Sequence, residues 1–266
     1  MNKELTMRRI STLAASRLDF TSLQQDGIRL LALLLMMGDH ANAALYLNSD
    51  ALMWLGRGAF PLFALVWGFN LAQRPVTQRQ ATRLWLWALV TQPVYWRAVA
   101  PDAGVLDDMN ILFTFAVATQ CCYWLQTKVE NNGNYADVLA ILLIICWPLF
   151  FPLGGFGAAG LLLLMACFRF YAGWPLAHSH MWADNLRTLM AVAICLLTVL
   201  LNSNGGAIPM LSGPLVSAVV LLVSTALRPL GTVRERQLLP RQFFQVAYIA
   251  HLALLWTLSV GLSWSA

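Results

Sequence analysis

The hydrophobic and polar positions of this chain alternate in long blocks. Apolar runs close to the roughly 20 residues that an α-helix needs to cross a bilayer follow one another between residues 27 and 262. Short polar stretches that contain Gly, Asn, Asp and Arg separate these runs. The pattern therefore predicts an all-α, polytopic integral membrane helix bundle.

About nine transmembrane helices are expected from these runs, in a membrane domain that covers residues 27–266. The residues ahead of it, 1–26, are basic and lack the apolar core of a signal peptide. Their apolar positions recur at helical spacing, which predicts a short interfacial helix on the cytoplasmic leaflet. The fifth and sixth spans could also be drawn as one span and a re-entrant piece. The nine predicted spans are 27–47, 51–72, 84–99, 110–126, 138–152, 156–172, 186–201, 210–227 and 243–262.

Composition and charge agree with this class of protein. Hydrophobic residues make up 59% of the chain and charged residues 11%, and 17 Lys and Arg against 12 Asp and Glu give a net charge of +5. Most basic residues fall in alternate loops, which places the N-terminus in the cytoplasm by the positive-inside rule. The lipid bilayer is therefore the expected partner of the basic loops, and no nucleic acid is expected.

The second predicted span contains the sequence Gly-Arg-Gly-Ala-Phe-Pro, with the arginine at Arg57. An arginine at mid-membrane costs at least roughly 2.5–3.5 kcal/mol unless it faces protein or water, so it marks a candidate functional site. Pro61 has no N–H to donate to the Arg57 carbonyl, which leaves that acceptor unpaired. We expect this carbonyl to face the same cavity as the guanidinium.

The first span carries a second polar pair, Asp39 and His40. At 1.5 Å per residue the pair lies roughly 18–20 Å above the start of its helix, in the outer half of the bilayer. Arg57 belongs to a helix of opposite direction and lies at a similar depth. Because only a short link, residues 48–50, joins the two helices, we expect these three side chains to converge.

Two interpretations of this cluster are open. In the functional one, His40 is a general base, Asp39 or a neighbour orients it, and Arg57 stabilises developing negative charge. In the structural one, Asp39 and Arg57 form a buried ion pair that fixes helix register, and His40 bonds a backbone carbonyl.

Other polar residues within the spans could extend the site or simply join helices. Asn70 lies near the cytoplasmic end of the second span, Asn110 opens the fourth, and the pair Gln92 and Pro93 is expected to break the third. His251 is the only ionisable group of the ninth span. No metal is expected, because the five cysteines are scattered through apolar segments and the loop pair His178 and His180 supplies only two ligands.

These motifs resemble one known family. The Gly56–Ala64 segment with Arg57, the Trp-Gly-Phe-Asn sequence that ends at Asn70, the Asp39-His40 pair, Asn-Ile-Leu-Phe from Asn110, and the terminal stretch through His251 are similar to the TraX family of conjugative plasmids. The resemblance implies an acetyltransferase of the bacterial inner membrane that N-acetylates the amino terminus of F-type pilin, a membrane-inserted subunit, with acetyl-CoA as donor.

A wider resemblance concerns Arg29 and His40, which are separated by ten residues as in the transmembrane acyltransferase-3 superfamily. It places Arg29 at the cytoplasmic mouth, where it suits a phosphate of CoA. We predict that Arg29, with Arg74, Arg79 and Arg83, binds the nucleotide of acetyl-CoA. The outer-loop aspartates could attract the ammonium of pilin or be ordinary loop charge; they are Asp102, Asp107 and Asp108. An acyl-histidine intermediate is a mechanistic alternative, and a proton-coupled transporter or a non-enzymatic pilin-binding assembly factor are functional alternatives.

Overall fold

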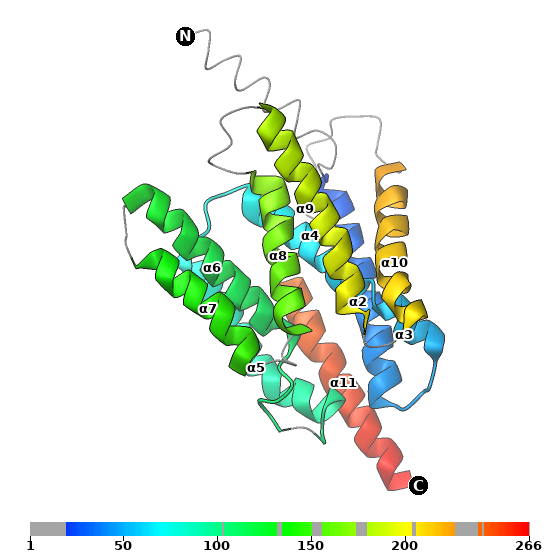
Figure 1. The fold of residues 1–266 in the computed structure, drawn as a ribbon. Coiled ribbons are helices and arrows are strands. Elements are labelled where there is room, and N and C mark those ends of the chain that lie inside the picture. Colours follow the sequence, from blue (N-terminus) through cyan, green and yellow to red (C-terminus); the bar gives the residue numbers. More distant parts are fainter. Residues whose placement is uncertain are drawn as a thin grey trace.

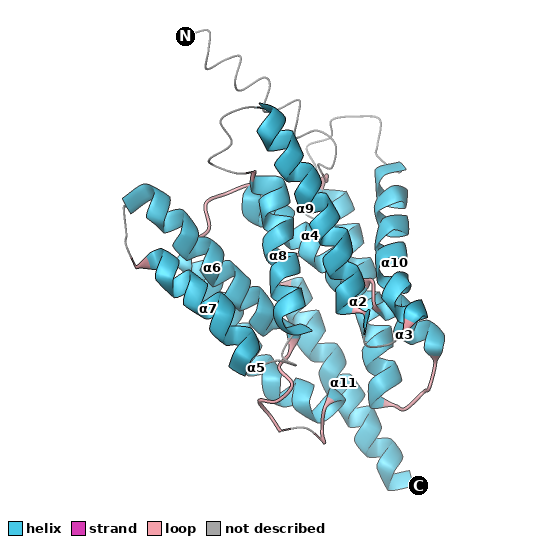
Figure 2. Ribbon diagram, in the orientation of Figure 1, coloured by secondary structure: helices cyan, strands magenta, loops and turns pink. Residues whose placement is uncertain are grey.

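The computed structural model shows an all-α bundle whose long helices run side by side (Figures 1 and 2). It describes residues 20–102, 104–131, 135–150, 156–173, 180–203, 206–226, 239–240 and 242–265. None of these residues lies in a β-strand, so the all-α prediction is confirmed for the described chain. The helices are α2 (Ser22–Ala44), α3 (Asp50–Gly56), α4 (Ala59–Ala72), α5 (Gln78–Val99), α6 (Ile111–Asn131), α7 (Ala136–Phe150), α8 (Gly157–Ala172), α9 (His180–Leu201), α10 (Ala207–Ala226) and α11 (Phe243–Ser265).

The predicted spans correspond to these helices with one exception. The fifth and sixth spans are two separate helices, α7 and α8, and not one span with a re-entrant piece. The exception is the second span, which the structure divides into α3 and α4 at Arg57 and Gly58. The interfacial helix predicted for the N-terminus falls largely on residues 1–19, outside the described residues.

The two prolines occupy different positions in their helices. Pro61 is the third residue of α4, where its missing N–H has no intrahelical partner to lose, so the helix starts ahead of it without disruption. Pro93 lies inside α5, which continues through it from Gln78 to Val99. The expectation that Gln92 and Pro93 break the third span was therefore wrong.

Capping side chains fix where the site-bearing helices begin. Thr21 and Gln24 form a capping box at the start of α2, in which each side chain accepts a hydrogen bond from the other residue's backbone N–H. Thr77 and Gln80 do the same for α5. These reciprocal bonds satisfy N–H groups that a helix leaves unpaired at its first turn.

The core lies where α4 packs against α8 and α2. Leu62, Ala64 and Leu164 are fully buried there. Gly68 of α4 allows the closest approach, because a Cβ atom built on it would lie 2.7 Å from the Cys167 backbone carbon of α8. The α4–α8 contact thus depends on a residue without a side chain.

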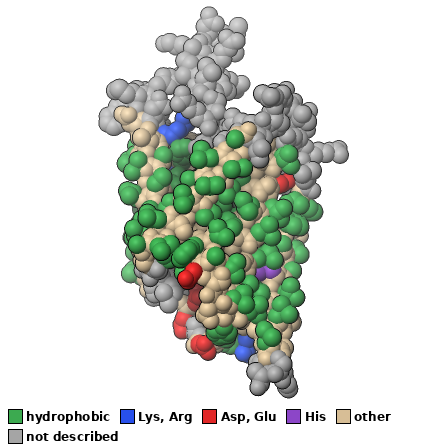
Figure 3. All heavy atoms as spheres, turned by 90° about the vertical axis from the view of Figure 1, so that its right-hand side faces the viewer, with side chains coloured by type: hydrophobic (Ala, Val, Ile, Leu, Met, Phe, Trp, Pro, Cys, Tyr) green, Lys and Arg blue, Asp and Glu red, His purple; other side chains and the backbone are tan. Residues whose placement is uncertain are grey.

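The outer surface is strongly apolar. Hydrophobic side chains cover most of the face shown in Figure 3, and α5, α7, α9, α10 and α11 all expose large aliphatic residues. Among the described residues, Asp50–Ala72 and Phe243–Leu262 are long and apolar enough to cross a membrane, and five further apolar helices are shorter. The outside of the bundle is thus compatible with a membrane protein.

We predict that Gly68→Ala lowers the thermal midpoint of the purified protein in detergent, because the added methyl group must displace the α8 backbone. Overpacking of this kind costs about 1–3 kcal/mol. Gly27→Ala in α2 is the matched control, since a Cβ there meets nothing within 4 Å and should leave the midpoint unchanged or raise it. Equal midpoints for the two variants would contradict the packing argument.

Candidate functional site

Two cavities lie one after the other along α2. The first, here called the Arg29 cavity, has a volume of about 390 Å³ and includes Arg29, Asn70 and Arg83 in its wall. The second, the His40 cavity, has a volume of about 430 Å³ and includes Asp39, His40, Arg57, Tyr95 and Asp108. Three residues contribute to both walls and so separate the two spaces; they are Met36, Ile111 and Tyr248.

The helices that line the cavities alternate in direction. Along α2 the chain runs from Arg29 in the Arg29 cavity to His40 in the His40 cavity, and along α5 it runs in the same direction from Arg83 to Tyr95. Along α4 it runs the other way, from Ala59 in the His40 cavity to Asn70 in the Arg29 cavity. This alternation is the one that consecutive membrane spans require. It also puts Arg29 and His40 about 16 Å apart along the helix axis, at 1.5 Å per residue.

His40 is held by a second histidine from the opposite end of the sequence. The distance from His40 Nδ1 to His251 Nε2 is 2.9 Å, and the two rings are nearly parallel, with an interplanar angle of 11°. His251 is 4% exposed, and its Nδ1 lies 3.2 Å from the Ala247 carbonyl oxygen. The structural interpretation, in which His40 bonds a backbone carbonyl, was therefore wrong.

This chain of contacts selects one tautomer of each neutral ring. His251 Nδ1 must carry a proton, because a carbonyl oxygen only accepts hydrogen bonds. Its Nε2 is then an acceptor, so His40 Nδ1 donates and His40 Nε2 keeps its lone pair. No hydrogen bond joins that Nε2 to another described residue, and His40 lines the cavity. The geometry thus leaves the Nε2 lone pair of this cavity residue without a partner among the described residues.

Two tyrosines complete the surroundings of His40. The Tyr95 ring of α5 stands edge-on to His40 with 6.2 Å between ring centroids, and the Tyr248 ring of α11 is tilted by 46° with 6.1 Å between centroids. The Tyr248 hydroxyl is buried near Ile111 and makes no hydrogen bond of ordinary geometry to a described residue. A buried polar atom in that condition needs a partner from elsewhere, such as a ligand.

Arg57 lies at the break between α3 and α4. Its guanidinium contributes to the His40 cavity, and its Nε is buried with no hydrogen-bond partner among the described residues. The Arg57 carbonyl does not face this cavity as expected. It lies against α10, where a Cβ atom built on Gly213 would be 3.1 Å from it.

Glycines on both sides of Arg57 let other helices approach. A Cβ atom on Gly56 would lie 2.5 Å from Asp39 Cβ, and one on Gly58 would lie 2.4 Å from a Val216 methyl group of α10. Asp39 and Arg57 therefore share one cavity wall, as expected, yet no ion pair joins them. The structural interpretation, in which Asp39 and Arg57 form a buried ion pair, is therefore not what the structure shows for these two described residues.

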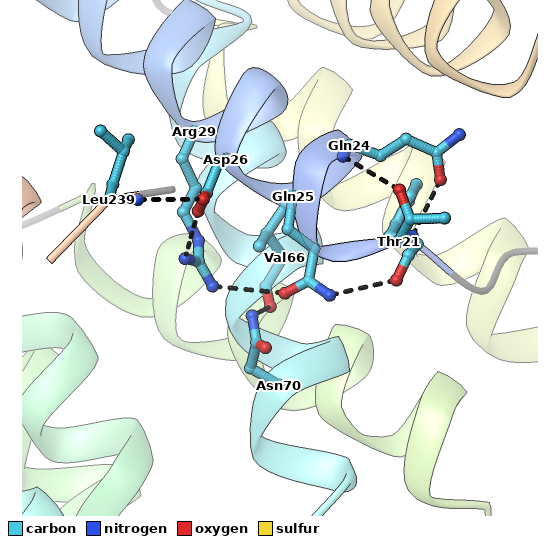
Figure 4. A network of polar contacts seen from close by, with 9 residues as sticks. Thr21, Gln24, Gln25, Asp26, Arg29, Val66, Asn70 and Leu239 are labelled. Atoms are coloured by element: carbon cyan, nitrogen blue, oxygen red, sulfur yellow. Dashed lines mark hydrogen bonds and ion pairs between the residues drawn. The ribbon is translucent and has the colours of Figure 1, made fainter. Parts of the chain in front are cut away.

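The predicted donor-binding residues separate into two groups. Arg29 pairs with Asp26 at 3.4 Å, donates to Gln25 at 3.5 Å and stands over the Phe244 ring, as the polar network in Figure 4 shows in part. Arg83 is exposed, lines the Arg29 cavity and has no partner among the described residues. Arg74 and Arg79 are exposed and do not contribute to the wall of either cavity.

The supporting amides have different surroundings. Asn70 lines the Arg29 cavity and donates to the Val66 carbonyl of its own helix (Figure 4). Asn110 is fully buried, donates to Ala88 and Gln92 of α5, and accepts from the Leu112 N–H at the start of α6. Asn110 thus joins two helices and lies outside both cavity walls.

The sequence did not single out several residues that line the cavities. Tyr95 and Tyr248 looked like ordinary apolar positions, and Asp108 was grouped with two loop aspartates that the structure leaves exposed. Gln245 has a buried, unpaired Oε1 atom and lines the Arg29 cavity. Spacing could have suggested Tyr248, which lies three residues before His251 and so on the same face of α11.

No group of three potential metal ligands comes together among the described residues. The side chains of His178 and His180, considered above as a pair, lie outside the described part of the chain.

Comparison with known proteins identifies the family. The family model described as "TraX protein" matches residues 24–259. The chain belongs to the TraX family. Protein TraX of Escherichia coli strain K12 is 36% identical over 258 residues, which cover 95% of this chain and 94% of that protein. A second Escherichia coli Protein TraX is 35% identical over 243 residues, which cover 89% of this chain and 88% of the relative. No solved structure matches the chain.

The matched TraX region contains both cavities and every residue named in their walls. The resemblance that the motifs suggested is therefore confirmed at the level of the family.

The histidine geometry predicts an unusual tautomer. In protein labelled with ¹⁵N-histidine, the NMR signals of His40 should show a protonated Nδ1 and an unprotonated Nε2. His251→Leu should abolish this preference, because His40 loses its acceptor. Leu254→Ala, an exposed change on the same helix, should leave the spectrum unchanged. A His40 that carries its proton on Nε2 in the unaltered protein would overturn the assignment.

Proposed function

We propose that this TraX family member is a membrane-embedded N-acetyltransferase that transfers an acetyl group from acetyl-CoA to the amino terminus of conjugative F-type pilin. The observation that carries the proposal is the pair of successive cavities, one with a cationic residue free to bind an anion and the other with a basic histidine nitrogen. Such an arrangement suits two substrates that enter from opposite sides and meet at the residues shared by both walls.

The Arg29 cavity has the chemistry to take the donor. Arg83 offers phosphate a guanidinium that has no partner among the described residues, and Arg29 adds a second cation that Asp26 partly neutralises. The buried Gln245 Oε1 needs a donor partner, which an amide N–H of the pantetheine arm would supply. The volume of the cavity falls in the range of small-molecule sites.

His40 supplies the base in this mechanism. Its Nε2 lone pair accepts a proton from the terminal ammonium of pilin, and His251 keeps that lone pair available by accepting from Nδ1. The neutral amine then forms a bond to the thioester carbonyl carbon. As the carbon–sulfur bond breaks, the thiolate takes a proton from His40 and the second amine proton is released. One proton leaves for each acetyl group transferred.

Arg57 stabilises the negative charge that develops on the thioester oxygen. Its Nε–H is already buried and unpaired, so no existing hydrogen bond must break first. The glycines beside it hold the helix break against α2 and α10, which fixes the backbone that carries Arg57.

We place this reaction in the bacterial inner membrane. The nine-span topology, with the N-terminus in the cytoplasm, rests on the positive-inside distribution of arginines, on the alternating helix directions and on the apolar outer surface. In this orientation the Arg29 cavity opens toward cytoplasmic acetyl-CoA, and the His40 cavity lies toward the outer leaflet.

Pilin produced with the His40→Ala or the Arg57→Ala variant should lack the N-terminal acetyl group while still accumulating in the membrane. Loss of one oxyanion donor lowers kcat by about 10²–10³, and loss of the base should act in the same direction. Intact-mass spectrometry of pilin from cells that carry each variant measures the result.

The control for this experiment is Arg97→Ala. Arg97 is exposed on α5, packs on the Trp96 ring and lies outside both cavity walls, so its pilin should be acetylated as in the unaltered protein. Fully acetylated pilin from both site variants would reject the site. Unacetylated pilin with the unaltered TraX protein would instead favour an assembly factor or a transporter.

The two cavities also predict which arginine binds the donor. Arg83→Gln should raise the KM for acetyl-CoA about tenfold with little change in kcat, because a phosphate contact made equally in ground and transition states is lost. Arg79→Gln, which alters an exposed arginine outside the cavity wall, should change that KM less than twofold. Steady-state kinetics with purified protein in detergent decides between them, and equal effects of the two changes would contradict the donor assignment.

A further inference from the structure

The His40 cavity contains more acidic than basic groups. The carboxylates of Asp39 and Asp108 contribute to its wall, whereas Arg57 is its one guanidinium among the described residues. With both carboxylates ionised and His40 neutral, the described residues of this cavity have an excess of one negative charge. Charges away from bulk water require compensation, so this excess favours a bound monocation.

Asp108 is the carboxylate with the better defined position. Its Oδ2 accepts a hydrogen bond from the Tyr95 hydroxyl at 3.1 Å, and its backbone carbonyl accepts one from the Gln92 side chain at 2.9 Å. Gln92 also bonds Asn110, so α5 and the start of α6 together fix this loop residue. Because Tyr95 also stands beside the His40 ring, the carboxylate and the base belong to one group of side chains.

The other two aspartates of the loop are different. Asp102 and Asp107 are exposed and do not line the cavity, and the Asp107 carboxylate accepts from the Gly104 N–H. Burial raises the pKa of Asp108, and the Tyr95 hydrogen bond only partly opposes this change. No ion pair joins Asp108 to a described residue, and a bound cation would offset the desolvation that burial imposes on its charged form.

A second observation points to a polar ligand in the same space. The Tyr248 side chain is 3% exposed and lines this cavity, and its hydroxyl lies near the Ile111 backbone without making a hydrogen bond of ordinary geometry to a described residue. The cavity thus combines an excess carboxylate with a buried hydroxyl that can still donate, next to His40.

We infer that Asp108 binds the primary ammonium of the acceptor peptide and makes this site select amines over hydroxyl acceptors. The acetyl transfer itself rests on the proposed function, but ammonium binding does not. A hydroxyl group in the place of the ammonium would leave the carboxylate without its counter-charge. Asp102 and Asp107 contribute nothing specific to this recognition.

The test uses full-length protein in detergent and two synthetic peptides with the pilin N-terminal sequence. One peptide has a free terminal amine, and the other has the corresponding 2-hydroxy acid as its first residue. Asp108→Asn keeps the size of the side chain and should raise the KM for the amine peptide about tenfold. The KM values for the hydroxy peptide and for acetyl-CoA should change less than twofold, as should all constants of the Asp102→Asn control.

A second variant protects the test against a folding defect. Tyr95→Phe removes the hydroxyl that holds Asp108 and should raise the KM for the amine peptide alone, by less than Asp108→Asn does. Equal effects of Asp108→Asn on the two peptides would reveal a merely structural role and overturn the inference. So would identical amine KM values for Asp108→Asn and Asp102→Asn.

Equilibrium binding of the amine peptide without acetyl-CoA separates this inference from the proposed function. If the unaltered protein transfers no acetyl group, the proposed function fails. The inference still stands if the amine peptide binds about tenfold more tightly to the unaltered protein than to Asp108→Asn, and the hydroxy peptide does not. Equal binding of the amine peptide to both proteins would overturn it.

Discussion

The arrangement of both cavities depends on the helix break at Arg57. A continuous helix from Asp50 to Ala72 would have to carry a guanidinium within an apolar run, and it would leave the Arg57 carbonyl without a partner along the helix because Pro61 has no N–H. The break removes this constraint, and the absence of side chains at Gly56 and Gly58 lets α2 and α10 close around it. Asp39 is thereby brought to the same wall as Arg57, while the Arg57 carbonyl turns toward α10. A costly charge is thus held where a ligand can use it.

The histidine pair shows how an apolar bundle can position a base without a second charge. An aspartate beside His40 would hold the ring through an ionic contact, but His251 does so as a neutral acceptor whose own proton is used by the Ala247 carbonyl. Neutral hydrogen bonds avoid the desolvation cost of a buried carboxylate. Asp39 makes no hydrogen bond to His40, so the orienting role that the sequence suggested for it falls to its alternative, a neighbour.

Much of the fold could be predicted from the sequence because each helix corresponds to an apolar run with polar residues at its ends. The convergence of Asp39, His40 and Arg57 also followed, since a short link forces antiparallel neighbours. What could not be predicted depends on contacts between distant segments. The His40–His251 bond joins residues 211 positions apart, and Tyr248 lines both cavities only because α11 packs against the other helices.

Pro93 misled the prediction because a membrane-type helix can continue through proline when neighbours satisfy the freed groups.

The distribution of charge between the two cavities gives the proposed reaction its direction. One wall has an unpaired Arg83 beside the neutralised Asp26–Arg29 pair, and the other has the excess carboxylate. An anionic donor is attracted to the first space and repelled by the second, and the reverse holds for a cationic amine. Met36, Ile111 and Tyr248 lie at the junction, so the two substrates can meet only there. In the proposed reaction, the opposite charges of the two cavities would thus select the two substrates before any contact at the reacting atoms.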